Sequence, residues 1–345
     1  MGNVSSAKPK EVDHMDKAIS LDKPMLQVSV APHIQQKITT SHLMYNTLIA
    51  LVPALLAGIY FFGFNSLKLA LICMATAMAC EAGMQSLMGR KLTIQNGSCL
   101  VLGLLFALIS TPELPWWTAV VGTAIAVILG REIYGGLGNN PFNAVLVGWA
   151  VARISFAEQM TTWIMPEPLF GLEPGGYIEY PPLEVIRVDG IDVFVDLPWL
   201  DLFIGNVPGT IGTVSVVAVL IGGIYLLARR VITWHIPVSF LVSAWLFGLI
   251  FYLIDPEVYA KPHIYLLSGW MVLGAFFLAT DKGTVPVTAP GMIIFGIGCG
   301  VLTMIIRYWG GYVDGVAFAI LIMNATTPLL DRVRPRVYGR VKEVA

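Results

Sequence analysis

Apolar runs that are long enough, or nearly long enough, to cross a lipid bilayer recur along most of this chain. A transmembrane helix needs about 20 consecutive residues that are mainly apolar. We recognise ten such segments, at about 43–63, 67–88, 98–110, 116–130, 142–157, 209–228, 233–254, 264–280, 290–307 and 312–330. The pattern predicts an all-α integral membrane protein with about ten transmembrane helices.

Charged residues are scarce and segregated. They make up 12% of the chain, whereas a soluble domain carries about 25%, and they lie almost entirely between the apolar runs and at the two ends. The first 42 residues are polar, with no apolar run next to Met1, so they are not a cleavable signal peptide. The third to fifth segments are short and carry Gly and Pro, which predicts short or broken helices there.

Lysine and arginine in short loops favour the cytoplasmic side of a membrane. With the N-terminus inside, most of these bases fall on the cytoplasmic face: Arg90, Lys91, Arg131, Arg229, Arg230, Lys282 and those of the C-terminal tail. Lys261 and Arg307 are exceptions. The opposite face receives the segment 158–208, which has nine acidic residues and one base, Arg187. Both termini are therefore predicted to be cytoplasmic.

The spans divide the chain into five regions. These are a cytoplasmic tail (1–42), five helices (43–157), an extracytoplasmic loop (158–208), five further helices (209–330) and a basic cytoplasmic tail (331–345). A connection as long as 158–208 is uncommon unless it is functional or disordered. We expect a folded, functional loop containing a strand-like run from Val185 to Val195, with a solvated spacer as the alternative.

The two five-helix regions resemble each other. The stretch GSCLVLGLLFALIST around Ser98 is similar to SGWMVLGAFFLAT from Ser268, and each is followed by an arginine and a Gly-Gly pair, at Arg131 and Arg307. Because each region has an odd number of spans, the second enters the membrane from the opposite face. The sequence therefore predicts two inverted repeats.

Inverted repeats commonly form a site near the membrane midplane, between broken helices. The glycine-rich stretches 130–143 and 310–315 are the best candidates for such breaks. The alternative is that their glycines only permit tight turns and close helix contacts. The polar residues of these stretches are candidates for an ion or electron pathway: Asn139, Asn140, Asn143 and Asp314.

Ionisable residues within a span are costly and therefore point to function. Glu81 is the only acid deep in a predicted span, so it is a further candidate, for cation coordination or proton transfer. A structural glutamate near the cytoplasmic interface is an equal alternative. The four cysteines show no metal-ligand spacing, so we predict packing roles and no metal site, with an iron–sulfur role as the alternative.

Several motifs spread over about 300 residues resemble a known family. They are VSVAPHI near Val28, YGGLGNNPFN from Tyr134, TWHIPVSFL from Thr233, LGAFFLATD from Leu273, GGYVDGVAFAIL from Gly310 and PLLDRVRPRVYG from Pro328. The chain resembles the RnfD proteins of Rnf-type ion-translocating oxidoreductases and, less closely, the NqrB proteins of sodium-pumping NADH:quinone reductases.

The resemblance implies a membrane subunit of a redox-driven ion translocase in the bacterial inner membrane. Such a subunit is not catalytic alone: it carries flavin, passes electrons between partner subunits and couples them to Na⁺ or H⁺ movement. The implied cofactor is FMN, with riboflavin as a second candidate. The implied partners are the other Rnf proteins, namely the membrane proteins RnfA and RnfE, the periplasmic flavoprotein RnfG and the cytoplasmic proteins RnfB and RnfC.

The family attaches FMN to a threonine in the long outer loop through a phosphoester. Here the position that aligns with this threonine is Val195, and no threonine occurs between Thr162 and Thr210. Three readings remain: noncovalent FMN, attachment to Thr161 or Thr162, or loss of this flavin.

Two other functions remain open. A solute channel or carrier also fits five-plus-five inverted repeats, and a subunit of a sodium-pumping quinone reductase fits the resemblance. No phosphate-binding loop or catalytic triad is present in the sequence, so no catalytic residue is predicted.

Overall fold

The computed structural model describes residues 39–169, 180–188 and 199–332, and every regular element within them is helical. Four helices are long and apolar enough to cross a membrane: α1 (Thr40–Phe62), α2 (Phe64–Leu87), α9 (His235–Ile254) and α12 (Ala289–Trp309). The prediction of an all-α, multi-pass membrane protein is confirmed for this part of the chain.

The remaining apolar segments form shorter helices. They are α3 (Ser98–Leu108), α4 (Trp116–Val127), α5 (Ala144–Ser155), α8 (Val216–Ala228) and α13 (Val316–Leu330). The predicted shortness of the third to fifth segments is confirmed. A π-helix, η2 (Ile128–Glu132), extends α4 beyond the predicted end of its apolar run.

The eighth apolar segment is broken. It consists of α10 (Pro262–Leu267), α11 (Met271–Leu273) and a π-helix, η5 (Gly274–Leu278). Gly269 has a φ of 68° in the interruption, a conformation that glycine adopts without a steric penalty. The break leaves backbone groups free for other partners.

The connections carry four short elements. These are η1 (Ile94–Asn96), η3 (Gln159–Thr161), α6 (Pro182–Val188) and α7 (Trp199–Ile204). The prediction of a strand-like run from Val185 was wrong in its described part, because this part belongs to α6. Pro182 at the start of α6 and Glu184 in its first turn favour a helix, whereas the short apolar alternation does not distinguish the two. The rest of that run, up to Val195, lies outside the described residues.

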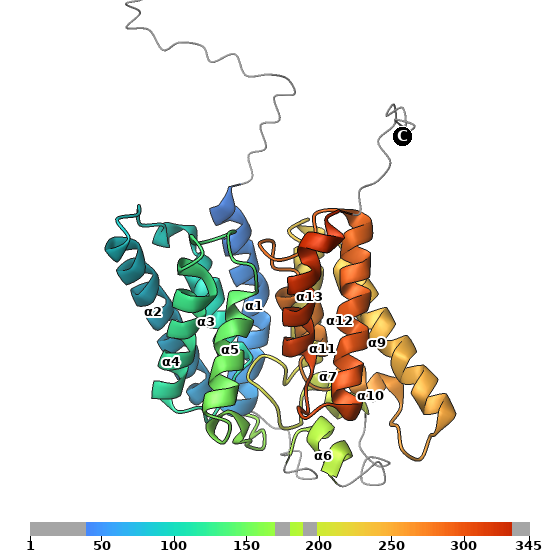
Figure 1. The fold of residues 1–345 in the computed structure, drawn as a ribbon. Helices are drawn as coiled ribbons and strands as arrows, with labels where there is room; N and C mark the ends of the chain where they lie inside the picture. Colours follow the sequence, from blue (N-terminus) through green and yellow to red (C-terminus); the bar gives the residue numbers. More distant parts are fainter. Residues whose placement is uncertain (1–38, 170–179, 189–198, 333–345) are drawn as a thin grey trace, which may run out of the picture. The chain divides into compact units, whose positions relative to one another are not determined.

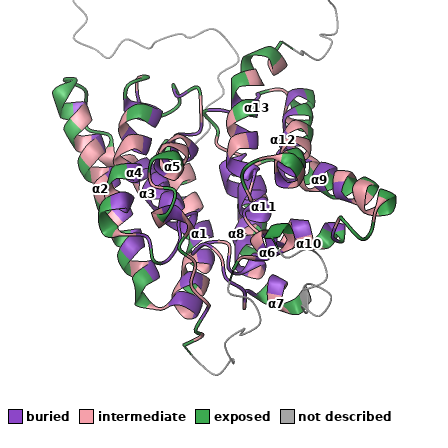
Figure 2. Ribbon diagram, turned by 60° about the horizontal axis from the view of Figure 1, so that its bottom comes forward, coloured by how far each residue is buried: buried purple, intermediate pink, exposed green. Residues whose placement is uncertain are grey.

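The helices of the described unit form two groups (Figure 1), α1 to α5 on one side and α8 to α13 on the other. Helix α1 begins and α13 ends at the same end of the bundle, and α6, α7 and α10 lie at the opposite end. Buried residues face the interior, whereas exposed positions mark the outward faces of α2 and α9 (Figure 2). Large apolar residues such as Leu71, Ile250 and Leu253 are more than half exposed there, as lipid-facing residues would be.

Helices α1 and α8 touch backbone to backbone at Gly222. A Cβ atom added to Gly222 would overlap the carbonyl oxygen of Ala50 and lie 3.0 Å from the ring of Phe277. Close contact of this kind through small residues is a usual means of packing membrane helices.

We expect Gly222→Ala to destabilise the protein by about 1–3 kcal/mol, because overpacking pushes α1 and α8 apart. The thermal unfolding midpoint in detergent measures this effect. Gly83→Ala in α2 is the matched control, because its added Cβ would meet no atom within 4 Å. Equal midpoints for the two variants would contradict the close contact.

Candidate functional site

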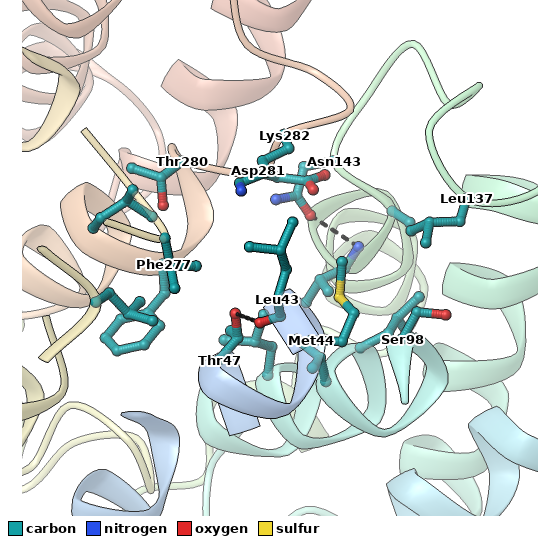
Figure 3. A pocket seen from close by; sticks show the side chains of 18 of the residues that line it. Leu43, Met44, Thr47, Ser98, Leu137, Asn143, Phe277, Thr280, Asp281 and Lys282 are labelled. Carbon is teal, nitrogen blue, oxygen red and sulfur yellow. Dashed lines mark hydrogen bonds between the residues drawn. The ribbon is translucent and has the colours of Figure 1, made fainter. Parts of the chain in front are cut away.

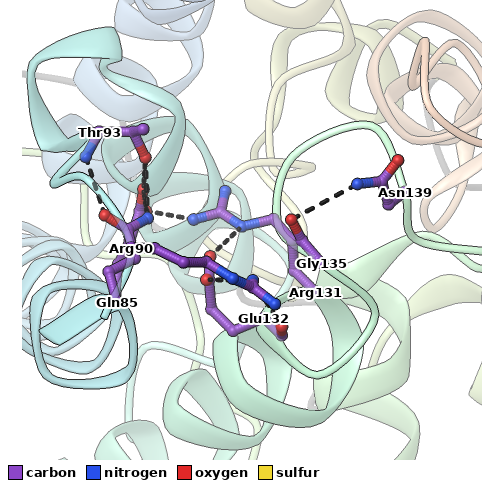
Figure 4. A network of polar contacts seen from close by, with 8 residues as sticks. Gln85, Arg90, Thr93, Arg131, Glu132, Gly135 and Asn139 are labelled. Carbon is purple, nitrogen blue, oxygen red and sulfur yellow. Dashed lines mark hydrogen bonds and ion pairs between the residues drawn. The ribbon is translucent and has the colours of Figure 1, made fainter. Parts of the chain in front are cut away.

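Glu81 is buried in α2, with 1% of its surface exposed. Its carboxylate forms an ion pair with the guanidinium of Arg131 in η2. It also accepts hydrogen bonds from Gln85 Nε2 at 3.1 Å and from Thr93 Oγ1 at 3.0 Å, within the polar network of Figure 4. The acid that the sequence placed deep in a span is therefore buried and paired with an arginine.

A second buried carboxylate, Glu132, lies beside the same arginine. Glu132 Oε1 is 3.5 Å from Arg131 Nε, and Glu132 Oε2 is 3.9 Å from Arg90 Nη1. Neither oxygen accepts a hydrogen bond within the described part of the chain. One buried arginine, Arg131, thus forms ion pairs with two buried carboxylates.

Sequence reasoning missed Glu132 because it ended the fourth span at residue 130. The signal that could have revealed it is the length of that span. An apolar run of only 15 residues must either remain short or continue through the next turn, and here η2 continues through Glu132.

Asn143 joins the two groups of helices. Its Oδ1 caps α5 by accepting from the backbone N–H of Val145 at 3.0 Å and of Leu146 at 3.3 Å. Its Nδ2 donates to the carbonyl of Leu278 in η5 at 2.9 Å. The π-helix supplies this carbonyl at the end of the broken eighth segment.

The other two candidate asparagines differ in position. Asn140 is buried, and its Nδ2 donates to the carbonyl of Phe142 at 2.8 Å. Asn139 is exposed, and its Nδ2 makes only a long contact, 3.4 Å, with the carbonyl of Gly135. Asn140 and Asn143 therefore line the same cavity, where Figure 3 shows Asn143, whereas Asn139 does not line it.

Asn140 and Asn143 line a cavity of about 110 Å³, open at its mouth, which we call the asparagine cavity. Its apolar walls include Leu102, Leu105, Leu226, Phe276 and Phe277, and its polar groups include Thr47, Ser98, Arg131, Asn140, Asn143, Thr280, Asp281 and Lys282. Side chains of both helix groups meet there (Figure 3). Arg131 connects this cavity to Glu81.

Asp281 lies on the rim of the asparagine cavity, just beyond the eighth segment. The residue keeps part of its surface exposed. Burial of its carboxyl group by the surrounding protein removes water and raises the pKa of Asp281. Hydrogen bonds from the backbone N–H of Gly283 and from the side chain of Asn140 oppose this rise. The rim is thus partly desolvated.

Asp314 forms a hydrogen bond with the backbone at the interruption of the eighth segment. Its Oδ1 accepts from Arg307 Nη2 at 3.0 Å, and its Oδ2 accepts from the backbone N–H of Trp270 at 2.7 Å. Oδ1 also accepts from the N–H of Val316 at 3.2 Å, at the start of α13. The carboxylate pairs with a buried arginine and satisfies two helix-terminal N–H groups.

Asp314 also lines a second cavity, of about 90 Å³, which we call the tryptophan cavity. Its other residues include Trp149, Trp163, Trp270, Arg153, Thr161, Glu184, Thr210 and Tyr312. The rings of Trp149 and Trp270 meet edge to face with their centroids 4.5 Å apart. This cavity combines aromatic walls with one arginine and several hydroxyl groups.

The candidate flavin attachment residues have different positions. Thr161 lies on the wall of the tryptophan cavity, where its Oγ1 donates to the carbonyl of Ala157 at 2.7 Å. Thr162 Oγ1 donates to the carbonyl of Glu158 at 3.2 Å, and Thr162 does not line the cavity. Val195 lies outside the described residues.

Comparison with known proteins decides the family. A model of the NQR2, RnfD, RnfE family matches residues 27–339. The chain belongs to this family. A relative from Escherichia fergusonii, named as the D component of an ion-translocating oxidoreductase complex, is 36% identical over 353 aligned residues, covering 92% of this chain and 99% of the relative.

Two further members of the NQR2, RnfD, RnfE family carry the same name. The relative from Stutzerimonas stutzeri is 38% identical and covers 88% of this chain and 93% of its own length. The relative from Yersinia pseudotuberculosis is 35% identical and covers 91% and 98%. The resemblance to RnfD proteins drawn from the motifs is confirmed over almost the full chain.

Proposed function

We propose that this protein is a membrane subunit of an Rnf-type, redox-driven ion translocase that passes electrons through bound flavin and couples them to Na⁺ or H⁺ movement. Family membership and the names of the relatives support the type of complex. The observation that carries the flavin role is the asparagine cavity, because it combines apolar walls with polar groups from both helix groups. The protein acts with partners and is not catalytic alone.

The asparagine cavity suits a neutral flavin such as riboflavin. Leu102, Phe276 and Phe277 offer apolar surface to a planar ring, as the walls of small-molecule pockets usually do. The hydroxyl groups of Thr47 and Thr280 donate to backbone carbonyls, so their oxygens remain able to accept from a ligand. A bound flavin supplies the electron chemistry, while these residues orient it and exclude water.

The tryptophan cavity suits FMN held without a covalent bond. Arg153 provides a cation for a phosphate, and Trp149 and Trp270 provide aromatic surface. Attachment to Thr161, on the cavity wall, is the alternative, because a phosphoester requires a hydroxyl group. Residues 163–209 contain neither serine nor threonine.

We expect the purified full-length protein to show flavin absorbance and to release all of its flavin on acid or detergent denaturation. Its denaturing gel band should not fluoresce, and Val195→Thr alone should not create a fluorescent band, since the flanking Asp192 and Asp196 repel a phosphate. Peptide mass spectrometry also tests whether any flavin is covalently attached. A peptide carrying the mass of FMN would contradict noncovalent binding.

A protein without flavin that conducts a solute in liposomes, with no redox partner present, would instead support the channel alternative. A role in a sodium-pumping quinone reductase is the closer alternative, and dependence of quinone reduction on this chain would support it. We further propose that the protein assembles with RnfA, RnfB, RnfC, RnfE and RnfG in the bacterial inner membrane.

Paired features support the proposed ten-span inverted repeat. Gly97 and Gly269, with φ of 73° and 68°, precede α3 and α11. In each half, a buried arginine precedes in sequence a polar residue that accepts from the first N–H groups of the next helix. Arg131 precedes Asn143, at the start of α5, and Arg307 precedes Asp314, at the start of α13. In this proposal the shorter helices complete the spans.

We expect both termini to be cytoplasmic and the end of α5 to face outward. In intact cells, a membrane-impermeant maleimide should label Glu158→Cys and should not label Lys91→Cys. Both positions are exposed; Lys91 follows the end of α2 and Glu158 the end of α5, and these two helices end on opposite sides of the bundle (Figure 1). Inverted vesicles provide the control. The opposite labelling pattern would reverse the proposed orientation.

A further inference from the structure

A third cavity lies where α2 and α4 begin. It measures about 220 Å³ and is formed by the first turns of α2 and by the loop that leads into α4. Its polar groups are Asn65, Lys68 and Glu113, and its apolar wall includes Leu69, Ile72 and Leu114. None of these residues belongs to the asparagine or the tryptophan cavity.

Lys68 and Glu113 carry opposite charges on the same cavity without neutralising each other. Both side chains are exposed, and within the described residues neither has an oppositely charged group within 4.0 Å. A ligand with a negative and a positive group would satisfy both side chains at once. A simple anion would satisfy Lys68 and meet repulsion from Glu113.

The position of this cavity at the start of a helix of membrane-spanning length would place it at the level of the lipid headgroups. Helix α2 is long and apolar enough to span the membrane, and Lys68 lies one turn inside its first residue, Phe64, so the lysine stem can extend toward the interface. Phe64 and Trp116 are 74% and 64% exposed beside the cavity, and aromatic residues, tryptophan above all, gather at membrane interfaces. Leu71, 54% exposed and one turn deeper, would face the acyl chains.

We propose that this cavity binds the headgroup of a zwitterionic aminophospholipid, phosphatidylethanolamine. The Lys68 ammonium and the Asn65 amide donate to the phosphate, and the Glu113 carboxylate accepts from the lipid ammonium. Trp116 packs against the glycerol region, and Ile72 against the start of an acyl chain. Phosphatidylcholine has no N–H to donate to Glu113, and phosphatidylglycerol has no cation, so both bind more weakly.

The proposal is tested with the delipidated full-length protein in detergent, by titration with each of the three lipids while thermal unfolding is followed. Phosphatidylethanolamine should raise the unfolding midpoint at the lowest lipid concentration. Glu113→Gln should raise its half-saturating concentration roughly tenfold, which corresponds to the loss of one charge-assisted contact, and should leave the response to phosphatidylglycerol no weaker. Lys68→Gln should weaken the response to all three lipids.

The matched controls are Glu257→Gln and Lys91→Gln, which remove exposed charges outside the cavity and should change nothing. Native mass spectrometry should show a retained phosphatidylethanolamine mass that Glu113→Gln reduces. Equal responses to phosphatidylethanolamine and phosphatidylglycerol, or a response unchanged by Glu113→Gln, would overturn the proposal. A midpoint raised by inorganic phosphate alone would point instead to a simple anion site. Because flavin content is not measured, failure here leaves the proposed redox function unaffected.

Discussion

Arg131→Gln is expected to lower the stability of the folded protein by about 3–5 kcal/mol, the usual cost of removing one partner from a buried ion pair. The substitution leaves Glu81 and Glu132, each 1% exposed, without their shared cation. Because total stability is typically about 5–15 kcal/mol, the yield of monodisperse protein should fall sharply. Size-exclusion chromatography and thermal unfolding measure both effects.

Glu81→Gln should be much milder than Arg131→Gln. Arg131 Nε already lies 3.5 Å from Glu132 Oε1, so the arginine keeps a carboxylate partner when Glu81 is neutralised. Because Glu81 is a candidate for cation coordination or proton transfer, we expect Glu81→Gln to change ion transport more than protein abundance. Wild-type pumping in vesicles by this variant would make Glu81 a structural residue.

Two comparisons separate charge from packing in this cluster. Arg229→Gln, which removes an exposed arginine, should leave stability unchanged. The triple variant Glu81→Gln, Arg131→Gln, Glu132→Gln should recover part of the lost stability, because no charge then remains unpaired. An unfolding midpoint of Arg131→Gln equal to that of the wild type would show that the buried carboxylates do not depend on this arginine.

Thr47→Trp is expected to remove the flavin of the asparagine cavity while the protein stays folded. Thr47 lies on α1, is half-buried and lines the asparagine cavity, so an indole ring there occupies space that the flavin ring would need. A steric cost of about 1.4 kcal/mol or more corresponds to at least tenfold weaker binding. The ratio of flavin absorbance to protein in the purified sample measures the loss.

Ile49→Trp is the matched control for Thr47→Trp. It adds a similar bulk to the same helix, but Ile49 is 54% exposed on the outward surface, so flavin content should not change. Normal flavin content in Thr47→Trp would exclude the asparagine cavity as the flavin site. It would then favour the tryptophan cavity, whose flavin these two substitutions do not touch.

The sequence determined the helices and much of their fine structure. Hydrophobic run length predicted the four long apolar helices α1, α2, α9 and α12 because a membrane requires continuous apolar helices, and it also predicted the short α3, α4 and α5. Local pattern failed at α6, where a few apolar residues suggested a strand around Val185. Short runs of this kind fit either period, and only packing decides between them.

Only the tertiary structure decided which polar groups meet. Arg131 pairs with Glu81 across 50 residues, and Asn143 reaches the carbonyl of Leu278 across 135, contacts that no local periodicity encodes. The π-helix that buries Glu132 and the break that exposes the N–H of Trp270 to Asp314 follow from how neighbouring helices crowd one another. The sequence thus determined where the apolar helices lie along the chain, whereas packing between distant helices decided where its cavities and buried charges lie.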